Sequence, residues 1–453
     1  MLYLFIALVI GIKSKPIINS IKEYSIGSNY TIAALVCTFF ATEIGSGNVV
    51  GITAKVYSKE ILFAVINSVA VAINYLIVAY WLSNKYKQLS GCISISDFIS
   101  KGYGQNAKII VSLVGSMMCV GVIAGQIIAI RSVLSCVYPI NQEIATLSAG
   151  VVFLIYTSLR GVKGVVLTDI FQFLLLIIII PLIASILVEQ VGGFNKIVSI
   201  SMEQYNNNKL SYKNFIDYSA LFIWFMIPGF YPSKMQRIIM ARDKNHLKKM
   251  MLYSAFLQIP LGIMIIFIGV GAIQLFPNAS ENSVLIEIIK HLIPIGIKGI
   301  VIAGIIAVAM STADSDLNAS SVILGEQIFN SKYLININEK RKLLIIKLVS
   351  LFLGLLSIIL AFKFNDILKI ILFFGSFYSA IITIPTIVLL CEIKLKKYYF
   401  YTNAILVILT ILITGEINSK DYKYIFISLP MFISISIFFI FIINQKVFKK
   451  NGI

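Results

Sequence analysis

Apolar stretches long enough to cross a membrane recur from one end of this sequence to the other. A spanning α-helix needs about 20 consecutive, mainly apolar residues. Residues 2–12 fall short of that length and are the weakest candidate. Because backbone polar groups must be satisfied inside a bilayer, the pattern predicts an all-α membrane protein with about 13 transmembrane helices. The candidate spans are residues 2–12, 29–54, 60–83, 107–137, 142–159, 164–188, 215–233, 250–276, 296–329, 342–362, 366–391, 398–414 and 424–445.

The composition leads to the same class. The chain has 453 residues, of which 58% are hydrophobic and 13% charged, and its mean hydropathy is +0.92. Soluble globular domains contain about 25% charged residues. The longest polar connection between spans runs from residue 189 to 214. We therefore expect no soluble domain, and we expect most of the protein surface to contact the lipid bilayer.

The net charge of +18 is distributed as in a membrane protein. Lysines and arginines gather after the first, third, fifth, seventh, ninth and eleventh spans and after the last one. Cytoplasmic loops carry such an excess of positive charge. This predicts a multi-pass protein of the plasma membrane, with its N-terminus outside and its C-terminus in the cytoplasm, and the composition favours a bacterial cytoplasmic membrane. Lys234 and Arg237 are counted among these loop charges, so a nucleic-acid partner is not expected.

Cysteine and histidine are too scattered to form a metal centre or a disulfide framework. The five cysteines occur singly, and His246 and His291 lie far apart in the sequence. Structural zinc sites need closely spaced pairs of such ligands. A membrane enzyme would need a clustered acid, base or metal set, which the isolated residues do not provide. The sequence therefore predicts a protein that is not an enzyme, and no protein partner is inferred.

Two spans are interrupted at positions that matter for function. Residues 39–48 contain an acid and two glycines, and residues 224–232 contain two prolines and a glycine. Broken helices free backbone groups, which bilayers tolerate only around a cavity or inside protein. The breaks lie five spans apart, so each opens a five-helix unit, and the two units have opposite orientations. Matched breaks in inverted repeats are typical of transporters. The predicted segments are 1–28 (extra helix and loop), 29–188 (first repeat), 189–214 (extracellular loop), 215–391 (second repeat) and 392–453 (two extra helices).

The ninth span turns polar at hydrophobic depth. Residues 307–321 place hydroxyls and two carboxylates in an apolar helix. Polar groups at that depth are costly and indicate a functional site. Ser311 and Thr312 are neighbours whose hydroxyls suit an oxygen cage for a small hard cation. Alternatively, both hydroxyls bond to carbonyls one turn earlier, as serine and threonine do in membrane helices.

Four separate motifs, in order, resemble the sodium:solute symporter family over about Tyr24 to Cys391. The resemblance implies the leucine-transporter-type (LeuT) fold, with two inverted five-helix repeats, and cation-coupled uptake of a solute. The motifs are residues 41–47 (Ala-Thr-Glu-Ile-Gly-Ser-Gly), 160–172 (Arg-Gly-Val-Lys-Gly-Val-Val-Leu-Thr-Asp-Ile-Phe-Gln), 232–243 (Pro-Ser-Lys-Met-Gln-Arg-Ile-Ile-Met-Ala-Arg-Asp) and 307–315 (Ala-Val-Ala-Met-Ser-Thr-Ala-Asp-Ser).

The resemblance also implies an ion site and nearby acids. Its sodium ligands would be the carbonyls of Ala41, Ile44 and Val308 and the hydroxyls of Ser311 and Thr312. Glu43 stands where some relatives have an essential acid, and it would tune or gate the site unless it only faces polar neighbours. Asp169 would lie on the release path of the ion, or would simply cap backbone groups. Asp314 would attract the cation, or would bond to polar side chains in the bundle.

The cargo of such a transporter would bind in a pocket between the broken spans. Na⁺ is expected as the co-transported ion and a small organic solute as the cargo, with proline or another amino acid as the first candidate. A sugar, choline, a vitamin acid or a cation-conducting channel remain alternatives. No cationic residue is expected at the depth of the pocket. Its candidate lining residues, whose aromatics could equally be ordinary core, are Ser46, Asn48, Gln126, Trp224, Tyr231, Phe374 and Tyr378.

Overall fold

The computed structural model describes residues 20–27, 29–138, 140–157, 161–207, 212–329, 337–393, 395–416 and 424–450. Throughout these ranges the regular secondary structure is helical. The predicted span 2–12 lies outside the described residues. The helices are α2 (Ile21–Ser25), α3 (Ile32–Glu43), η1 (Gly47–Gly51), α4 (Ile52–Tyr57), α5 (Ile61–Tyr80), η2 (Leu82–Lys85), α6 (Tyr86–Leu89), α7 (Ile95–Tyr103), α8 (Gln105–Val137), α9 (Gln142–Thr157), α10 (Val162–Val191), α11 (Phe194–Asn207), α12 (Tyr212–Met226), α13 (Pro232–Ile239), α14 (Lys244–Leu275), η3 (Glu281–Ser283), α15 (Val284–His291), α16 (Ile295–Phe329), α17 (Glu339–Lys363), α18 (Ile367–Leu390), α19 (Tyr398–Glu416) and α20 (Ile425–Lys450).

Seven of the described helices are long and apolar enough to cross a bilayer, and the bent pair α3 and η1–α4 raises the number to eight. The seven begin at residues 61, 105, 162, 244, 295, 339 and 367. Parts of α9, α19 and α20 form shorter apolar helices. The all-helical class is therefore confirmed for the described residues. The larger count of about 13 spans, and their grouping into two inverted repeats, stay predictions.

Both predicted helix breaks are present. The first follows Glu43: α3 ends there, the π-helical turn η1 begins at Gly47, and the two halves of the span are bent by 55°. The second separates α12, which ends at Met226, from α13, which begins at Pro232. Proline at the first position of a helix is favourable, because its missing N–H has no intrahelical partner there. The same glycines and prolines that interrupt the pattern in the sequence thus end and restart the helices.

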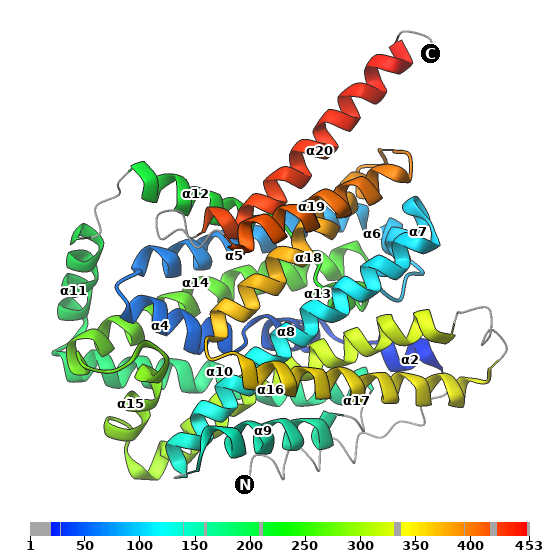
Figure 1. Ribbon diagram of the computed structural model, residues 1–453. Helices are drawn as coiled ribbons and strands as arrows, with labels where there is room; N and C mark the ends of the chain where they lie inside the picture. The colour runs from blue at the N-terminus through cyan, green and yellow to red at the C-terminus, as the bar shows by residue number, and fades with distance from the viewer. Residues whose placement is uncertain are drawn as a thin grey trace.

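The core of the bundle is formed by α8 and α16, which pack against each other along their length (Figure 1). α8 also contacts α7, α9, α17 and α18, and α16 also contacts α10, α13, α17 and α3. The whole polar stretch 307–321 of α16 is buried. A helix with this many polar groups is stable inside a bilayer only if neighbouring helices enclose it, and here they do.

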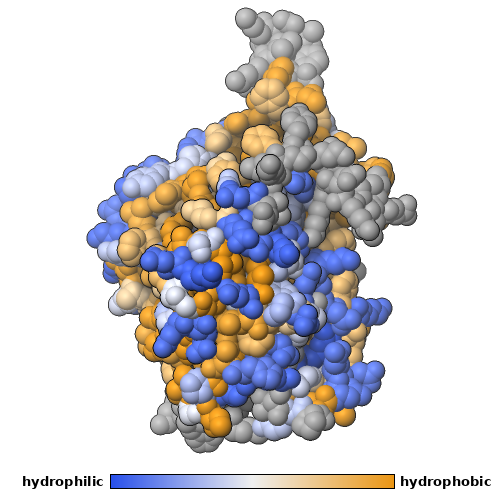
Figure 2. Space-filling model, turned by 90° about the vertical axis from the view of Figure 1, so that its left-hand side faces the viewer, coloured by the Kyte–Doolittle hydropathy of each residue, from blue (hydrophilic) through white to orange (hydrophobic). Residues whose placement is uncertain are grey.

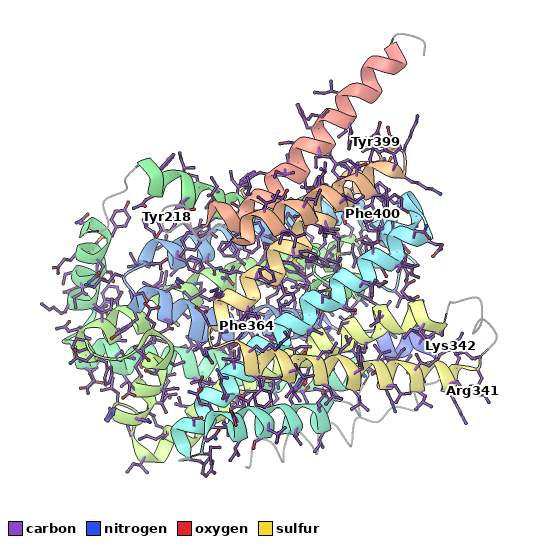
Figure 3. All side chains as sticks on the ribbon, viewed as in Figure 1. Tyr218, Arg341, Lys342, Phe364, Tyr399 and Phe400 are labelled. Carbon is purple, nitrogen blue, oxygen red and sulfur yellow. The ribbon has the colours of Figure 1, made fainter. Side chains whose placement is uncertain are left out.

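The sides of the bundle present large apolar side chains outward. Phe256 is 77% exposed, and Ile178 and Ile359 are also exposed. Such side chains suit contact with lipid. Hydrophilic side chains are spread among apolar ones on the end face that carries α11 and α15 (Figure 2). Charged groups also mark a helix end: Arg341 and Lys342 lie at one end of α17, and Phe364 lies at the other (Figure 3).

Close packing between α8 and α18 depends on Gly121. A Cβ atom at this position would lie 2.2 Å from a ring atom of Phe374 and 2.9 Å from its Cβ. We predict that Gly121→Ala lowers the stability of the purified protein by about 1–3 kcal/mol, the usual cost of overpacking. The measurement is the thermal unfolding midpoint in detergent.

The control is Gly299→Ala, at an exposed helical position where nothing lies within 4 Å of the added carbon. We expect it to change stability by less than about 0.5 kcal/mol. Equal midpoints for the two variants would contradict the close approach of α8 and α18.

Candidate functional site

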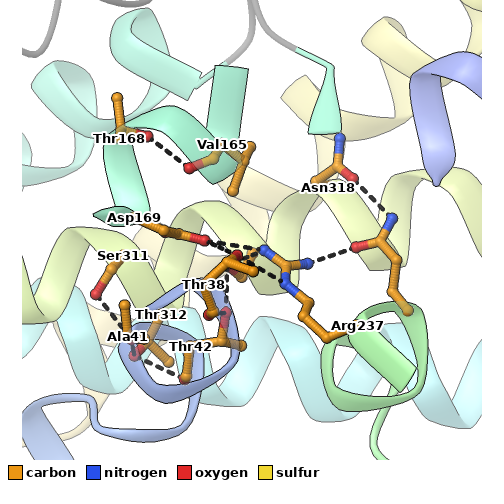
Figure 4. A network of polar contacts seen from close by, with 12 residues as sticks. Thr38, Ala41, Thr42, Val165, Thr168, Asp169, Arg237, Ser311, Thr312 and Asn318 are labelled. Atoms are coloured by element: carbon orange, nitrogen blue, oxygen red, sulfur yellow. Dashed lines mark hydrogen bonds and ion pairs between the residues drawn. The ribbon is translucent and has the colours of Figure 1, made fainter. Parts of the chain in front are cut away.

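Hydroxyls of α16 contact the end of α3 beside the first break (Figure 4). Ser311 Oγ donates to the carbonyl oxygens of Ala41 and Val308, both at 2.9 Å. Thr312 Oγ1 donates to the carbonyls of Thr42 at 3.0 Å and Ala41 at 3.4 Å. Ser311 thus bonds back along its own helix and also across to α3, whereas Thr312 bonds to α3; the cation cage stays a prediction. Four of the five predicted sodium-ligand oxygens, those of Ala41, Val308, Ser311 and Thr312, therefore lie in one cluster.

The fifth residue, Ile44, is buried where α3 ends. Its N–H donates to Phe40, and neither hydroxyl bonds to it. The approach of the two helices here requires Gly45, because a Cβ atom would lie 2.6 Å from Thr312 Oγ1. Any larger residue would push α3 and α16 apart, so the glycine of the motif keeps the oxygens close.

A buried ion pair lies one turn from this cluster. Arg237 Nη2 is 3.2 Å from Asp169 Oδ2, and both side chains are 0% exposed. Arg237 also donates to Ser315 Oγ at 2.6 Å and to Gln236 Oε1 at 2.6 Å. Thr38 donates to the same carboxylate oxygen of Asp169, which brings α3 into the network (Figure 4). The network therefore joins α3, α10, α13 and α16.

The sequence prediction that Lys234 and Arg237 are loop charges is wrong. Lys234 is 4% exposed and Arg237 is fully enclosed. The physical reason is that α13 lies against α3 and α16 instead of leaving the bundle. A buried cation is tolerated when a carboxylate pairs with it, and Glu43 and Asp169 do so here.

A cavity of about 180 Å³ lies beside the oxygen cluster. Thr42, Ile44 and Thr312 contribute to its wall, so cluster and cavity share residues. Three of the seven predicted pocket residues line it: Asn48, Trp224 and Tyr231. Asn48 Nδ2 donates to the carbonyl of Glu43 at 2.9 Å, and Trp224 Nε1 donates to Ser379 at 3.0 Å.

The other four lie outside the lining of this cavity. Gln126 Oε1 accepts the N–H of Ser46 at 2.8 Å and so braces the broken helix. The hydroxyl of Tyr378 donates to the carbonyl of Phe230 at 2.8 Å, which ties α18 to the second break. Phe374 packs on α8 at Gly121. Gln126 and Tyr378 thus brace the two breaks, which border the cavity.

Several polar residues of the cavity were not singled out from the sequence. Lys234 Nζ lies 3.1 Å from Glu43 Oε2 and 3.3 Å from Asn74 Oδ1. The expectation that no cation reaches this depth is therefore wrong. In the sequence, Lys234 lies two residues beyond Pro232, where the second break ends, and this position was the signal that it belongs to the site.

Two carboxylates of α16 differ in their placement. Asp316 lines the cavity and accepts a hydrogen bond from Cys119 at 3.6 Å. Asp314 is also buried, at 2% exposure, but is not part of the cavity wall. The two residues face different sides of the helix, so of these two carboxylates only Asp316 belongs to the cavity wall.

Known proteins resemble this chain over most of its length. This chain is 24% identical to the sodium/sialic acid symporter NanT of Aliivibrio fischeri over 340 residues, which are 71% of this chain and 66% of NanT. It is 22% identical to the high-affinity proline transporter PutP of Bacillus subtilis, over 82% of this chain and 81% of PutP. The match thus spans slightly less than two thirds of NanT.

Solved structures share the fold. The substrate-bound, outward-open state of a Na⁺-coupled sialic acid symporter superposes with a TM-score of 0.82 at 22% identity, covering 98% of this chain and 96% of that one. MHP1, a nucleobase-cation-symport-1 family transporter, superposes with a TM-score of 0.53 at 12% identity. The sequence model described as "Sodium:solute symporter family" matches residues 24–397. The resemblance seen in the motifs is confirmed: this chain belongs to the sodium:solute symporter family.

Proposed function

We propose that the protein is a sodium-coupled secondary active symporter that imports a small organic solute by alternating access. The observation that carries this proposal is the oxygen cluster between α3 and α16, which shares Thr42 and Thr312 with an internal cavity. An ion and a solute bound there would touch the same two helices. In this proposal the protein is a multi-pass protein of a bacterial cytoplasmic membrane, with two inverted five-helix repeats, its N-terminus outside and its C-terminus in the cytoplasm.

Sodium would be held by oxygen atoms alone. The proposed ligands are the carbonyls of Ala41, Ile44 and Val308 and the hydroxyls of Ser311 and Thr312. Hard cations prefer such carbonyl and hydroxyl oxygens. The hydroxyls now donate to the carbonyls of Ala41, Val308 and Thr42. Binding of an ion would therefore require each hydroxyl proton to turn away and each oxygen to face the metal.

Ion and solute would favour each other's binding. Sodium would hold the end of α3 against α16, and this end of α3 carries Thr42 and Glu43 into the cavity. By linkage, a solute that prefers the same arrangement raises the affinity for sodium equally. The two repeats would then rock against each other to open the site on the other side. One sodium crossing ~100 mV supplies about 2.3 kcal/mol, which supports roughly fiftyfold accumulation before the sodium gradient is added.

The acids near the site would have separate roles. Glu43 would tune the site through its place beside the ion ligands. Asp169 would lie on the path of the ion toward the cytoplasm, where its pairing with Arg237 would close that path while the cavity faces outward. Asp314 would add negative potential within α16. The alternative of a cation channel remains distinguishable, because a channel accumulates no solute.

Removing the two hydroxyls should weaken sodium binding. The variant Ser311→Ala with Thr312→Ala loses two ligand oxygens, each worth about 1 kcal/mol. We predict a roughly thirtyfold rise in the sodium concentration for half-maximal solute uptake. Uptake of radiolabelled solutes into proteoliposomes, with sodium varied at a fixed membrane potential, measures it.

The matched control is Ser321→Ala, on the same helix, whose hydroxyl donates to the carbonyl of Asn318 at 2.9 Å. Its sodium dependence should equal that of the unchanged protein. Sodium dependence unaltered in the double variant would remove the assigned ion site.

The Arg237–Asp169 pair allows a second prediction. Either Asp169→Asn or Arg237→Gln leaves a buried charge without its partner, which costs about 3–5 kcal/mol. The double variant leaves neither charge, so we expect it to be more stable than the sum of the two single effects implies. Thermal unfolding in detergent of the unchanged protein, the two single variants and the double variant gives the coupling free energy between the two charges. Additive losses would show that the two charges do not interact.

A further inference from the structure

The cavity contains an ion pair that the family resemblance did not lead us to expect. Lys234 lies 3.1 Å from Glu43, and both side chains line the cavity. We propose that this pair recognises a small zwitterionic α-amino acid: Lys234 binds the carboxylate, and Glu43 binds the ammonium group. This inference rests on the proposed function and assigns the solute class of the same cavity.

The placement of this pair differs from that of a purely structural one. The Arg237–Asp169 pair is fully enclosed, with both side chains 0% exposed. In the cavity pair, Lys234 is 4% exposed and Glu43 is 16% exposed. Glu43 is part of the wall of the cavity. Its carboxylate is therefore within reach of a solute, while its partner cation is positioned by the protein.

The protein holds Lys234 firmly in place. Asn74 Oδ1 accepts from Nζ at 3.3 Å, and the ring of Tyr75 lies 4.9 Å from the ammonium. Phe39 places a second ring 5.7 Å away. Aromatic faces attract a cation at such distances. A lysine fixed by these contacts loses little freedom when it binds an anion, which favours specific recognition.

Hydrogen-bonding capacity remains on both members of the pair. An ammonium has three donors, and Lys234 Nζ uses two of them within the described part of the chain, toward Glu43 and Asn74. The contacts of Glu43 with Lys234 and Tyr75 both go to Oε2. The third donor and the second carboxylate oxygen match the two charged ends of an amino acid.

Asn67 is a further polar residue of the cavity wall. It is 6% exposed and also lines a second, smaller cavity. Its Oδ1 is buried and has no hydrogen-bond partner in the described part of the chain. A buried acceptor without a partner is unfavourable, so a ligand donor such as an ammonium group would stabilise it. This gives the ammonium a second acceptor besides Glu43.

Size and charge both limit the solute. A cavity of about 180 Å³ is smaller than the roughly 300 Å³ at which pockets for drug-sized ligands begin. Trp224, Tyr231, Met118 and Leu372 provide apolar wall for a short side chain. Three charged side chains belong to the cavity wall, Lys234, Glu43 and Asp316, and a zwitterion adds no net charge to them. A simple anion would add a third negative charge beside the two carboxylates, and a simple amine would leave the remaining donor of Lys234 without an acceptor.

The first experiment compares solutes that differ in one charge. The full-length protein in proteoliposomes, with an inward sodium gradient, is offered radiolabelled proline, alanine and serine, with glucose and N-acetylneuraminate as other classes. Unlabelled pyrrolidine, which lacks the carboxylate of proline, and cyclopentanecarboxylate, which lacks its amine, serve as competitors. We expect one or more of the amino acids to accumulate, and both one-charge analogues to compete at least about tenfold less well than the amino acid.

The second experiment removes the charges from the protein. Lys234→Met should raise the amino-acid concentration for half-maximal uptake by about 10- to 100-fold, as for one lost hydrogen bond to a charged group. If the single variant does not fold, Lys234→Met with Glu43→Gln takes its place. This double variant removes both charges of the pair, so neither is left unpaired, and it should show the same loss of affinity for the amino acid. The control is Lys55→Met, because Lys55 pairs with Glu60 at 3.0 Å outside the cavity.

The outcomes separate the two proposals. If no solute accumulates with sodium, the proposed function and this inference both fall. If glucose or N-acetylneuraminate accumulates and no amino acid does, only the inference falls. It also falls if an amino acid accumulates with an affinity that neither cavity variant changes, or if an analogue lacking one charge competes as well as the amino acid. Sodium-induced thermal stabilisation without solute should persist in Lys234→Met, which keeps Glu43 and every proposed ion ligand, and this distinguishes a lost solute site from a lost ion site.

Discussion

The structure depends on enclosing polar groups where no water is available. The middle of α16 carries hydroxyls, amides and carboxylates, and every one of residues 307–323 is buried. Inside a bilayer these groups must be satisfied by other parts of the chain. The end of α3 supplies carbonyls, α13 supplies a guanidinium, and α8 supplies close-packed wall. The cavity, the ion pairs and the oxygen cluster are all consequences of how these partners surround one helix.

The fold was predictable where its signal is local. Gly45 and Gly47 mark the first break, and Pro228 and Pro232 mark the second, because these residues disfavour a continuous helix wherever they occur. The positions of Ser311 and Thr312 at hydrophobic depth could likewise be read from their apolar flanks. The number of spans stays a prediction, because seven or eight of the described helices are long and apolar enough to cross a bilayer, against the 13 expected.

The site was only partly predictable, because which side chains line the cavity depends on how each helix is rotated about its own axis. Tyr231 and Tyr378 are both aromatic residues near the second break, yet the first lines the cavity and the second bonds to Phe230. Lys234 follows a break and precedes a basic loop, so its charge indicated the cytoplasm. Only the positions of Glu43 and Asn74, more than 150 residues away in the sequence, explain why it is buried.

The burial of α16 also has a consequence for biogenesis. Each aspartate at the centre of a lone helix costs about 2.5–3.5 kcal/mol on insertion into lipid, and α16 contains Asp314 and Asp316. Of its three main neighbours, α8 and α10 precede it in the chain and α17 follows it, so ribosomes release α8 and α10 earlier. Newly made α16 therefore meets a prepared polar surface when it leaves the translocon, and it has no need to dwell alone among acyl chains.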